Sequence, residues 1–174
     1  MNKALLVIDM LNDFSRKEGA LFVPENERII PEISKWIKKF REKGDYIIFI
    51  CDNHIVDDKE FSKWPPHAIS GTWGAEIVEE LKPELDSGKE FIVKKTTYSS
   101  FYKTELEELL KKLNVYELYL TGCVINICVY FAAMEAVLRG FKVFVIKDAV
   151  AAIDEKDKDY VFKDMKNVLG VDLL

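Results

Sequence analysis

Short apolar runs alternate with helical patterns from one end of the chain to the other, and this alternation limits the fold more than any other feature. A short apolar run between turn signals is typical of a strand buried on both faces. Strands that alternate with helices form a mostly parallel sheet covered on both sides. We therefore predict an α/β fold with three αβα layers around a doubly wound, mostly parallel six-stranded sheet. The expected strands are residues 4–8, 46–51, 91–93, 116–120, 142–146 and 171–174.

Helical patterns lie between these strands. In the first, apolar residues recur at helical spacing over residues 33–40. Pro31 is expected to open this helix, or to break it from a preceding turn, and Gly44 is expected to end it. A later helix is predicted over residues 127–139, with Gly140 just past its end.

Two further helices are predicted from the residues at their starts. Thr104 followed by Glu107 is a capping-box pattern. Asp154 can cap the last helix of the chain. The buried face of that last helix is expected to include Tyr160, Val161, Met165 and Val168.

Composition favours one globular domain and argues against several kinds of partner. Of the 174 residues, 49% are hydrophobic, which suits a single domain over residues 1–174 with a substantial core. The net charge of −5 disfavours nucleic acids and membrane surfaces, which attract basic patches. The first apolar run is too short for a signal peptide, and no run is long enough to span a membrane. Three cysteines without a disulfide-framework spacing favour a cytoplasmic location.

Residues 52–75 break the alternation of strands and helices. A connection this long in a compact domain is usually functional. The segment holds both histidines of the chain, His54 and His67, and begins at Asp52. Two imidazoles and a carboxylate suit Zn²⁺, Fe²⁺ or Mn²⁺ with positions left open for water or substrate. On composition alone, ordinary loop histidines without a metal are the more frequent case.

A carboxylate, an amine and a thiol follow the ends of three predicted strands. Asp9 follows the first strand, Lys94 and Lys95 follow the third, and the fourth leads to Cys128. The carboxyl ends of parallel strands meet at one edge of an open sheet, where ligands bind. Cys128 is expected in the first turn of its helix, where backbone N–H groups stabilise a thiolate. Together these groups could form a nucleophilic site.

Each of these residues also has a structural explanation. A cysteine among apolar neighbours is most often a small buried side chain. Asp9 could cap a turn, and Lys95 could be a solvated surface charge. The shared position at the sheet edge is what favours the nucleophilic interpretation.

Four segments of the chain form a recognisable set of motifs: residues 5–9 (Leu-Leu-Val-Ile-Asp), 12–14 (Asn-Asp-Phe), 95–101 (Lys-Thr-Thr-Tyr-Ser-Ser-Phe) and 122–129 (Gly-Cys-Val-Ile-Asn-Ile-Cys-Val). These segments resemble the isochorismatase-like cysteine hydrolases, and the similarity runs nearly from end to end. The resemblance implies the isochorismatase-like hydrolase fold and a catalytic triad of Asp9, Lys95 and Cys128. Lys94 is the adjacent alternative to Lys95, and the motif spacing disfavours it.

The resemblance also implies features of the backbone around the cysteine. It predicts a cis peptide bond between Cys123 and Val124, and an oxyanion hole formed by the N–H groups of Val124 and Cys128. The chain departs from the family pattern where Ile125-Asn126 replaces the usual Thr-Asp and Cys123 replaces a common valine. Cys123 is interpreted as structural because it lies at the strand end, before the helical turn.

The unusual loop resembles the nicotinamidase branch of this family, in which an Asp-x-His and a later Pro-x-His bind a divalent metal. Asp52, His54 and His67 occupy these positions, followed by residues 71–74 (Gly-Thr-Trp-Gly). Ala68 replaces a cysteine that nicotinamidases often carry there. The resemblance therefore implies a divalent metal at these ligands, with zinc first and iron or manganese as alternatives.

The implied activity is a cysteine-dependent amidohydrolase that converts nicotinamide to nicotinate and ammonia through a thioester, as in NAD salvage. Phe14 and Trp73 are candidates to stack on the substrate ring, although either could serve only in packing. Family members are often homo-oligomers, so self-association is expected. The main alternative is a cysteine hydrolase of the same fold that acts on an N-carbamoyl or other small amide.

Three other functions fit less well. Isochorismate hydrolysis does not need a cysteine nucleophile. A thiol redox protein would leave Asp9, Lys95 and both histidines unexplained. A non-catalytic binding module on this fold is the third, and the fold by itself does not distinguish it from an enzyme.

Overall fold

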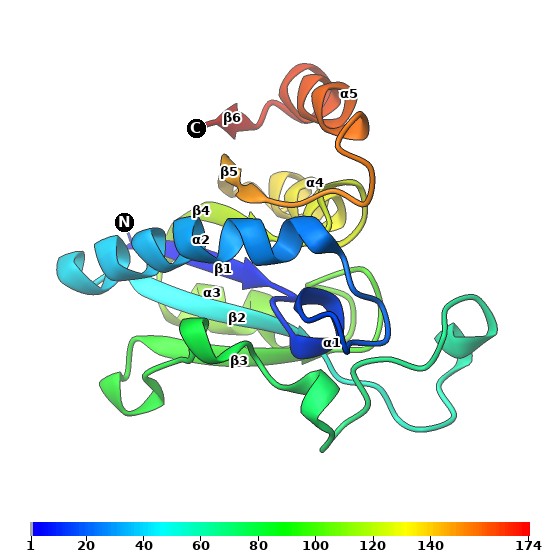
Figure 1. The fold of residues 1–174 in the computed structure, drawn as a ribbon. Helices are drawn as coiled ribbons and strands as arrows, with labels where there is room; N and C mark the ends of the chain where they lie inside the picture. The colour runs from blue at the N-terminus through cyan, green and yellow to red at the C-terminus, as the bar shows by residue number, and fades with distance from the viewer. Residues whose placement is uncertain (1) are drawn as a thin grey trace.

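A parallel β-sheet runs through the centre of the computed structural model, which describes residues 2–174 (Figure 1). Its six strands lie in the order β3-β2-β1-β4-β5-β6, and every pairing between neighbours is parallel. This confirms the predicted α/β fold with a six-stranded, mostly parallel sheet. The strands are β1 (Asn2–Ile8), β2 (Tyr46–Asp52), β3 (Glu90–Lys95), β4 (Val115–Gly122), β5 (Lys142–Val150) and β6 (Asp172–Leu173).

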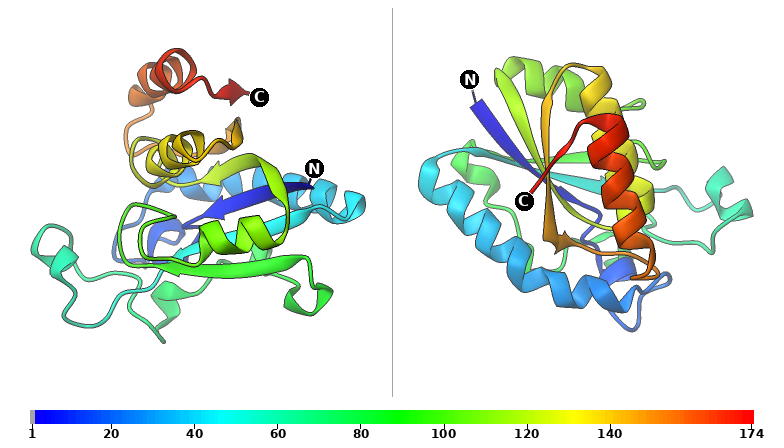
Figure 2. Two further views of the ribbon diagram at one scale, coloured as in Figure 1. Left: turned by 180° about the vertical axis from the view of Figure 1, so that it is seen from behind. Right: turned by 90° about the horizontal axis from the view of Figure 1, so that it is seen from above.

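Helices cover both faces of this sheet, which gives the three predicted layers. Helix α2 packs on one face, and α3, α4 and α5 pack on the other, as the view from above shows (Figure 2). Within residues 2–174, no helix combines the length and the apolar character needed to cross a membrane. The helices are α1 (Asn12–Ser15), α2 (Pro24–Lys43), α3 (Leu106–Lys112), α4 (Tyr130–Leu138) and α5 (Asp157–Asp164).

Strand β1 shows why the central strands are continuous apolar runs. Leu5 and Val7 face α2, whereas Leu6 and Ile8 face the opposite helices, and all four side chains are at most 1% exposed. Alternate residues of a strand point to opposite faces, so a strand covered on both sides must be apolar at every position. Burying each such side chain contributes roughly 1.5–3 kcal/mol.

Helix α2 differs from the sequence prediction because Pro31 lies inside it instead of opening it. The helix begins at Pro24. N–H groups in the first turn have no partner within the helix, so a proline, which lacks an N–H, removes no hydrogen bond there. Ile29 and Ile30 are 5% and 6% exposed, and they extend the buried stripe of Ile33 toward the N-terminus. Burial of this stripe outweighs the hydrogen bond that Pro31 removes.

The predictions for the last helices were partly wrong. Thr104 accepts a hydrogen bond from the Leu106 N–H at 3.3 Å, but Glu107 pairs with Lys111 and Arg139 instead of closing a capping box. In the C-terminal helix, the face predicted to be buried is only half buried. Val161 and Met165 are 8% and 0% exposed, whereas Tyr160 and Val168 are 74% and 71% exposed. This helix lies beside the short strand β6 at the end of the sheet, so only a narrow stripe of it is covered.

The chain reverses its winding direction between β1 and β4, and Gly122 makes their close approach possible. Gly122 pairs with Ile8 across the two strands and has φ +106°. A Cβ atom on Gly122 would lie 2.0 Å from the Ile8 carbonyl oxygen. Glycine is therefore required where the two strands deliver their residues to the sheet edge.

We predict that Gly122→Ala lowers the free energy of unfolding by roughly 3 kcal/mol or more, because the cost of backbone strain and the cost of the steric clash with Ile8 are summed. Gly140→Ala is the matched control. Gly140 has φ +83°, but nothing lies within 4 Å of its added Cβ, so only backbone strain of about 1–2 kcal/mol is expected. Urea unfolding of both variants measures the difference, and equal losses would contradict the proposed collision.

Candidate functional site

A cavity of about 370 Å³ opens beyond the carboxyl ends of the central strands. Asp52 and Lys95 are register partners at the ends of β2 and β3, and Asp9 follows β1 with its N–H donating to the Ile50 carbonyl at 2.8 Å. The turn after β4 adds a π-helical segment, Ile125–Val129. The side chains from these elements meet at the reversal point of the sheet, where α/β proteins bind ligands. Residues that line the cavity include Asp9, Phe14, Asp52, Glu60, Trp64, His67, Tyr98, Cys123, Val124, Cys128 and Ile153.

The Lys95 ammonium lies at the centre of the polar groups. Its side chain is fully buried, and Nζ is 2.8 Å from Asp9 Oδ2 and 3.6 Å from Cys128 Sγ. It also pairs with Asp52 Oδ1. Lys94, by contrast, is exposed. Of the two adjacent lysines, the structure therefore places Lys95 with Asp9 and Cys128.

The two buried carboxylates beside Lys95 have opposite protonation tendencies. Burial, and then the charge of Asp52, raises the pKa of Asp9 to about 6, against the opposing effect of Lys95. Burial acts in the same direction on Asp52, but Lys95 and His54 outweigh it, so the pKa of Asp52 is lowered. Asp9 therefore exchanges a proton near neutral pH, whereas Asp52 stays ionised.

Cys128 lies within the π-helical segment and is 8% exposed. Burial raises the pKa of its thiol well above the usual value, and the nearby ammonium of Lys95 does not compensate for this. The resting thiol is therefore protonated and needs a base to become a nucleophile. Asp9 has a pKa of about 6 and contacts the same Lys95 ammonium as Cys128, so its carboxylate is placed where it could accept that proton.

The backbone before Cys128 contains the predicted cis peptide bond. The peptide bond between Cys123 and Val124 is cis, and Val124 and Cys128 both line the cavity. The Cys123 thiol donates to the backbone carbonyl of Asp9 at 3.2 Å. Asp9 itself has φ +52°, an uncommon backbone conformation for this residue type. Cys123 therefore contacts the backbone of Asp9, whereas Cys128 contacts Lys95.

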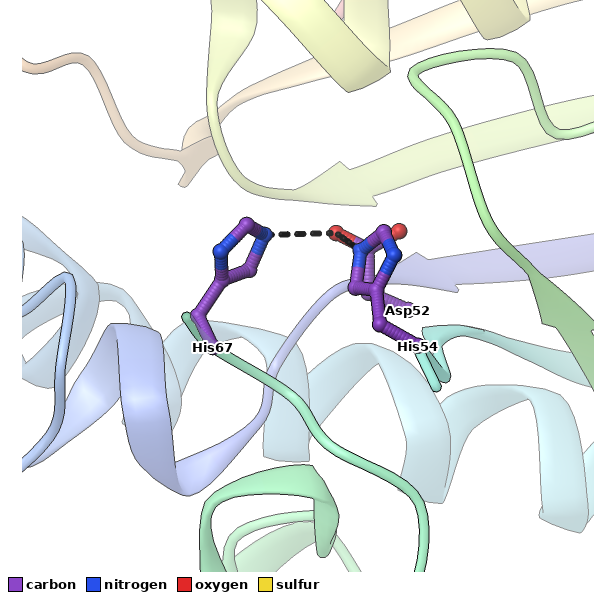
Figure 3. A group of neighbouring side chains, drawn as sticks. All are labelled: Asp52, His54 and His67. Atoms are coloured by element: carbon purple, nitrogen blue, oxygen red, sulfur yellow. Dashed lines mark ion pairs between the residues drawn. The ribbon is translucent and has the colours of Figure 1, made fainter. Parts of the chain in front are cut away.

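Asp52, His54 and His67 come together as a set of three buried ligands (Figure 3). Nε2 of His54 and Nε2 of His67 lie 3.8 Å and 3.9 Å from Asp52 Oδ2. The other ring nitrogens are already bonded, because His67 Nδ1 donates to the Pro65 carbonyl at 2.8 Å and His54 Nδ1 is 3.1 Å from Asp58. Such outer contacts orient imidazoles that bind metals.

The chemistry of this set fits a divalent metal. His54 Nε2 is buried and has no hydrogen-bond partner among the described residues, and a buried unsatisfied nitrogen is costly unless something binds it. Two imidazole nitrogens and one carboxylate oxygen, all within 4.8 Å of one another, match the ligands of Zn²⁺, Fe²⁺ and Mn²⁺.

Several residues of the cavity wall were not predicted from the sequence, and four of them carry polar or large apolar side chains at the site. Trp64, Tyr98, Glu60 and Ile153 line the cavity, and Glu60 Oε1 lies 4.0 Å from His67 Nε2. The position of Trp64, three residues before His67, was the signal available.

The structure treats the two predicted aromatic residues differently. Phe14 lines the cavity, and its ring centroid lies 5.5 Å from that of His67. Trp73 is 48% exposed and is not part of the cavity wall. Its backbone carbonyl instead accepts a hydrogen bond from the Asn12 side chain at 2.9 Å. The candidate role of Trp73 in substrate stacking is therefore not supported, and Trp64 is the tryptophan at the cavity.

Comparisons with known proteins agree with this site. The model of the isochorismatase domain matches residues 3–172. The crystal structure of nicotinamidase/pyrazinamidase PncA from Bacillus subtilis is 34% identical, with a TM-score of 0.93 and 99% of each chain covered. Pyrazinamidase of Pyrococcus horikoshii in complex with zinc is 34% identical, with a TM-score of 0.91 over 100% of this chain and 99% of that one.

A third solved structure belongs to an enzyme with a different substrate. N-carbamoylsarcosine amidase from Thermoplasma acidophilum is 33% identical, with a TM-score of 0.88, and the match covers 99% of this chain and 95% of that one. The domain match spans nearly the whole chain, and the solved structures share its fold at more than 30% identity. The chain therefore belongs to the isochorismatase family.

Proposed function

We propose that this protein hydrolyses the carboxamide C–N bond of a small neutral ring amide such as nicotinamide or pyrazinamide, with Cys128 as the nucleophile. One observation carries the proposal: a single cavity is lined by a thiol, by a carboxylate with a pKa of about 6, and by Asp52 and His67 of the candidate metal-ligand set, with His54 buried beside them. The buried Lys95 ammonium contacts Asp9, Asp52 and Cys128. The similarity to nicotinamidases and pyrazinamidases supports the same substrate class.

The walls of the cavity favour a neutral substrate over an anionic one. Asp9, Asp52 and Glu60 contribute carboxylates, and within residues 2–174 no arginine or lysine side chain lines the cavity. Lys95 lies behind this surface and is already paired with two of these carboxylates. A substrate carboxylate would be desolvated here without a protein cation. An aromatic amide would instead contact the rings of Phe14 and Trp64.

The proposed first half-reaction acylates the enzyme. Asp9 accepts the proton of the Cys128 thiol, and the sulfur attacks the amide carbon. The N–H groups of Val124 and Cys128 stabilise the oxyanion that forms, and the Lys95 ammonium balances the buried negative charges. Asp9 then returns the proton to the departing nitrogen, so ammonia leaves and the C–N bond is replaced by a thioester.

The proposed second half-reaction releases the acid. Asp9, again unprotonated, takes a proton from water as the water oxygen attacks the thioester carbon. The C–S bond breaks, Cys128 regains a proton, and the carboxylic acid leaves. Asp52, His54 and His67 would hold the divalent metal, which supplies a Lewis-acidic centre for a ring nitrogen of the substrate.

We predict that Cys128→Ala lowers kcat by at least about 10³-fold while the protein remains folded, because no other group supplies the thioester. Cys51→Ala is the matched control, since Cys51 is a buried cysteine that does not line the cavity. Intact-protein mass spectrometry during turnover should detect the acyl adduct in the parent and in Cys51→Ala only. A Cys128→Ala variant with near-parental turnover would contradict the assignment of Cys128 as the nucleophile.

Metal removal is expected to stop turnover. We predict one divalent metal ion per chain, loss of activity on chelation, and recovery on adding back Zn²⁺, Fe²⁺ or Mn²⁺. In His67→Ala the metal content should fall to a small fraction of the parental value, because one of three protein ligands is lost. Elemental analysis measures the metal content, and full activity of a metal-free parent protein would contradict the prediction.

The substrate class is tested with four amides in an ammonia-release assay. Nicotinamide and pyrazinamide should exceed N-carbamoylsarcosine in kcat/KM by roughly 10²-fold or more, because the last substrate carries a carboxylate. Benzamide lacks the ring nitrogen and should be poorer than nicotinamide. Preference for N-carbamoylsarcosine would instead favour the second candidate, an N-carbamoyl amidase, whose structural likeness to this chain is also high.

A further inference from the structure

Asp13, in helix α1, binds two separate segments of the chain with its two carboxylate oxygens. Oδ1 accepts a hydrogen bond from the Ala20 N–H at 3.0 Å, and Oδ2 accepts one from the Ala68 N–H at 2.7 Å. Ala20 belongs to the wall of the cavity. Ala68 directly follows His67, a proposed metal ligand. Asp13 has no role in the proposed reaction, although residues 12–14 are among the segments that resemble the family.

Ala68 lies between the two proposed histidine ligands in the hydrogen-bond network. Its N–H donates to Asp13, and its carbonyl accepts the N–H of His54 at 2.9 Å. Ala68 is fully buried and has φ +44°, so its backbone conformation is unusual for alanine. Ala68 therefore connects the backbones of the two histidines, and its own N–H is held by the Asp13 carboxylate.

The chain makes room for this carboxylate. A Cβ atom on Gly74 would lie 2.1 Å from Asp13 Oδ2, so any larger residue there would displace the carboxylate. The neighbouring Asn12 side chain donates to the Trp73 carbonyl at 2.9 Å, which holds the same turn against α1. Gly74 therefore leaves the space that the Asp13 carboxylate occupies.

We propose that Asp13 is a positioning residue for the metal site. By accepting the Ala68 N–H, it fixes the residue that follows His67 and that hydrogen-bonds to the backbone of His54, and it connects this residue to the cavity wall at Ala20. Metal affinity depends on Asp13 although Asp13 does not contact the metal. The inference rests on the proposed metal-dependent function.

The first test measures Zn²⁺ binding to purified Asp13→Asn. Asparagine has one acceptor oxygen and one NH₂ group, so in either orientation one of the two backbone N–H groups faces a donor. Zn²⁺ affinity should fall about 10-fold to 100-fold, as for other outer residues that orient metal ligands. Competition with a chromophoric chelator gives the affinity. Asp57→Asn is the matched control. It removes the same charge from an exposed position in the loop that carries His54 and His67, and the variant should bind Zn²⁺ like the parent.

The increase in Tm caused by Zn²⁺ separates a positioning role from a general loss of stability. The metal-free protein is the reference for each variant, so a destabilised fold alone lowers both Tm values and leaves their difference unchanged. For Asp13→Asn this difference should shrink, and for Asp57→Asn it should match that of the parent.

Gly74→Ala is a second variant that leaves the carboxylate present but displaces it. Its Zn²⁺ affinity should also fall, and the double variant with Asp13→Asn should lose less than the sum of the single losses. If Asp13→Asn does not fold, Gly74→Ala alone decides. Zn²⁺ affinities of the variants within twofold of the parental value overturn the role of Asp13. A parent protein that binds none of Zn²⁺, Fe²⁺ and Mn²⁺ overturns the metal site of the proposed function, and this inference with it.

Discussion

The buried ammonium of Lys95 is the interaction on which the centre of the molecule depends. Its charge is enclosed by Asp9, Asp52 and Cys128. Desolvating a cation costs several kcal/mol unless anions pair with it, and removing one partner of such a pair typically costs about 3–5 kcal/mol. Asp9 and Asp52 meet this requirement from two adjacent strands, while the thiol of Cys128 lies 3.6 Å away. The relative positions of three strand ends therefore depend on this one charge.

Asp52 extends this arrangement to the candidate metal ligands. Its Oδ1 pairs with Lys95, and its Oδ2 faces the imidazoles of His54 and His67. The Asp52 carboxylate thus lies next to Lys95, which contacts the proposed nucleophile, and next to the two histidines that would hold a metal ion. The network explains why Asp52 stays ionised in a buried position while Asp9, which carries less positive charge around it, has a raised pKa.

The sheet edge could be predicted from the sequence, because parallel strands with short connections deliver their last residues to the same place. This reasoning brought Asp9, Lys95 and Cys128 together, but it did not by itself choose between Lys94 and Lys95. Adjacent strand residues point to opposite faces, and only the packing shows which face holds the thiol. The family resemblance favoured Lys95, and the burial of its side chain agrees.

Irregular backbone was harder to predict than strands and helices. Trp64 and Trp73 lie in one long connection without periodicity, so the only sequence signal for which of them reaches the cavity was the position of Trp64 close to His67. Pro31 shows a different limit, because local propensity predicted a helix start where the burial of Ile29 and Ile30 extends the helix instead. Tertiary burial was the deciding contribution at Pro31, and the sequence window around it does not contain that information.

The connection between β2 and β3 projects away from the sheet in both side views (Figures 1 and 2). It carries Glu60, Trp64 and His67, whereas Lys95 belongs to β3, Asp9 directly follows β1, and Cys128 lies in the turn after β4. The groups of the proposed reaction and much of the polar and aromatic wall of the cavity therefore reside on separate parts of the chain. Natural variation can remodel this one connection, and with it the choice of amide, while the reactive centre stays intact. A shared scaffold can in this way serve both ring amides and carbamoyl compounds.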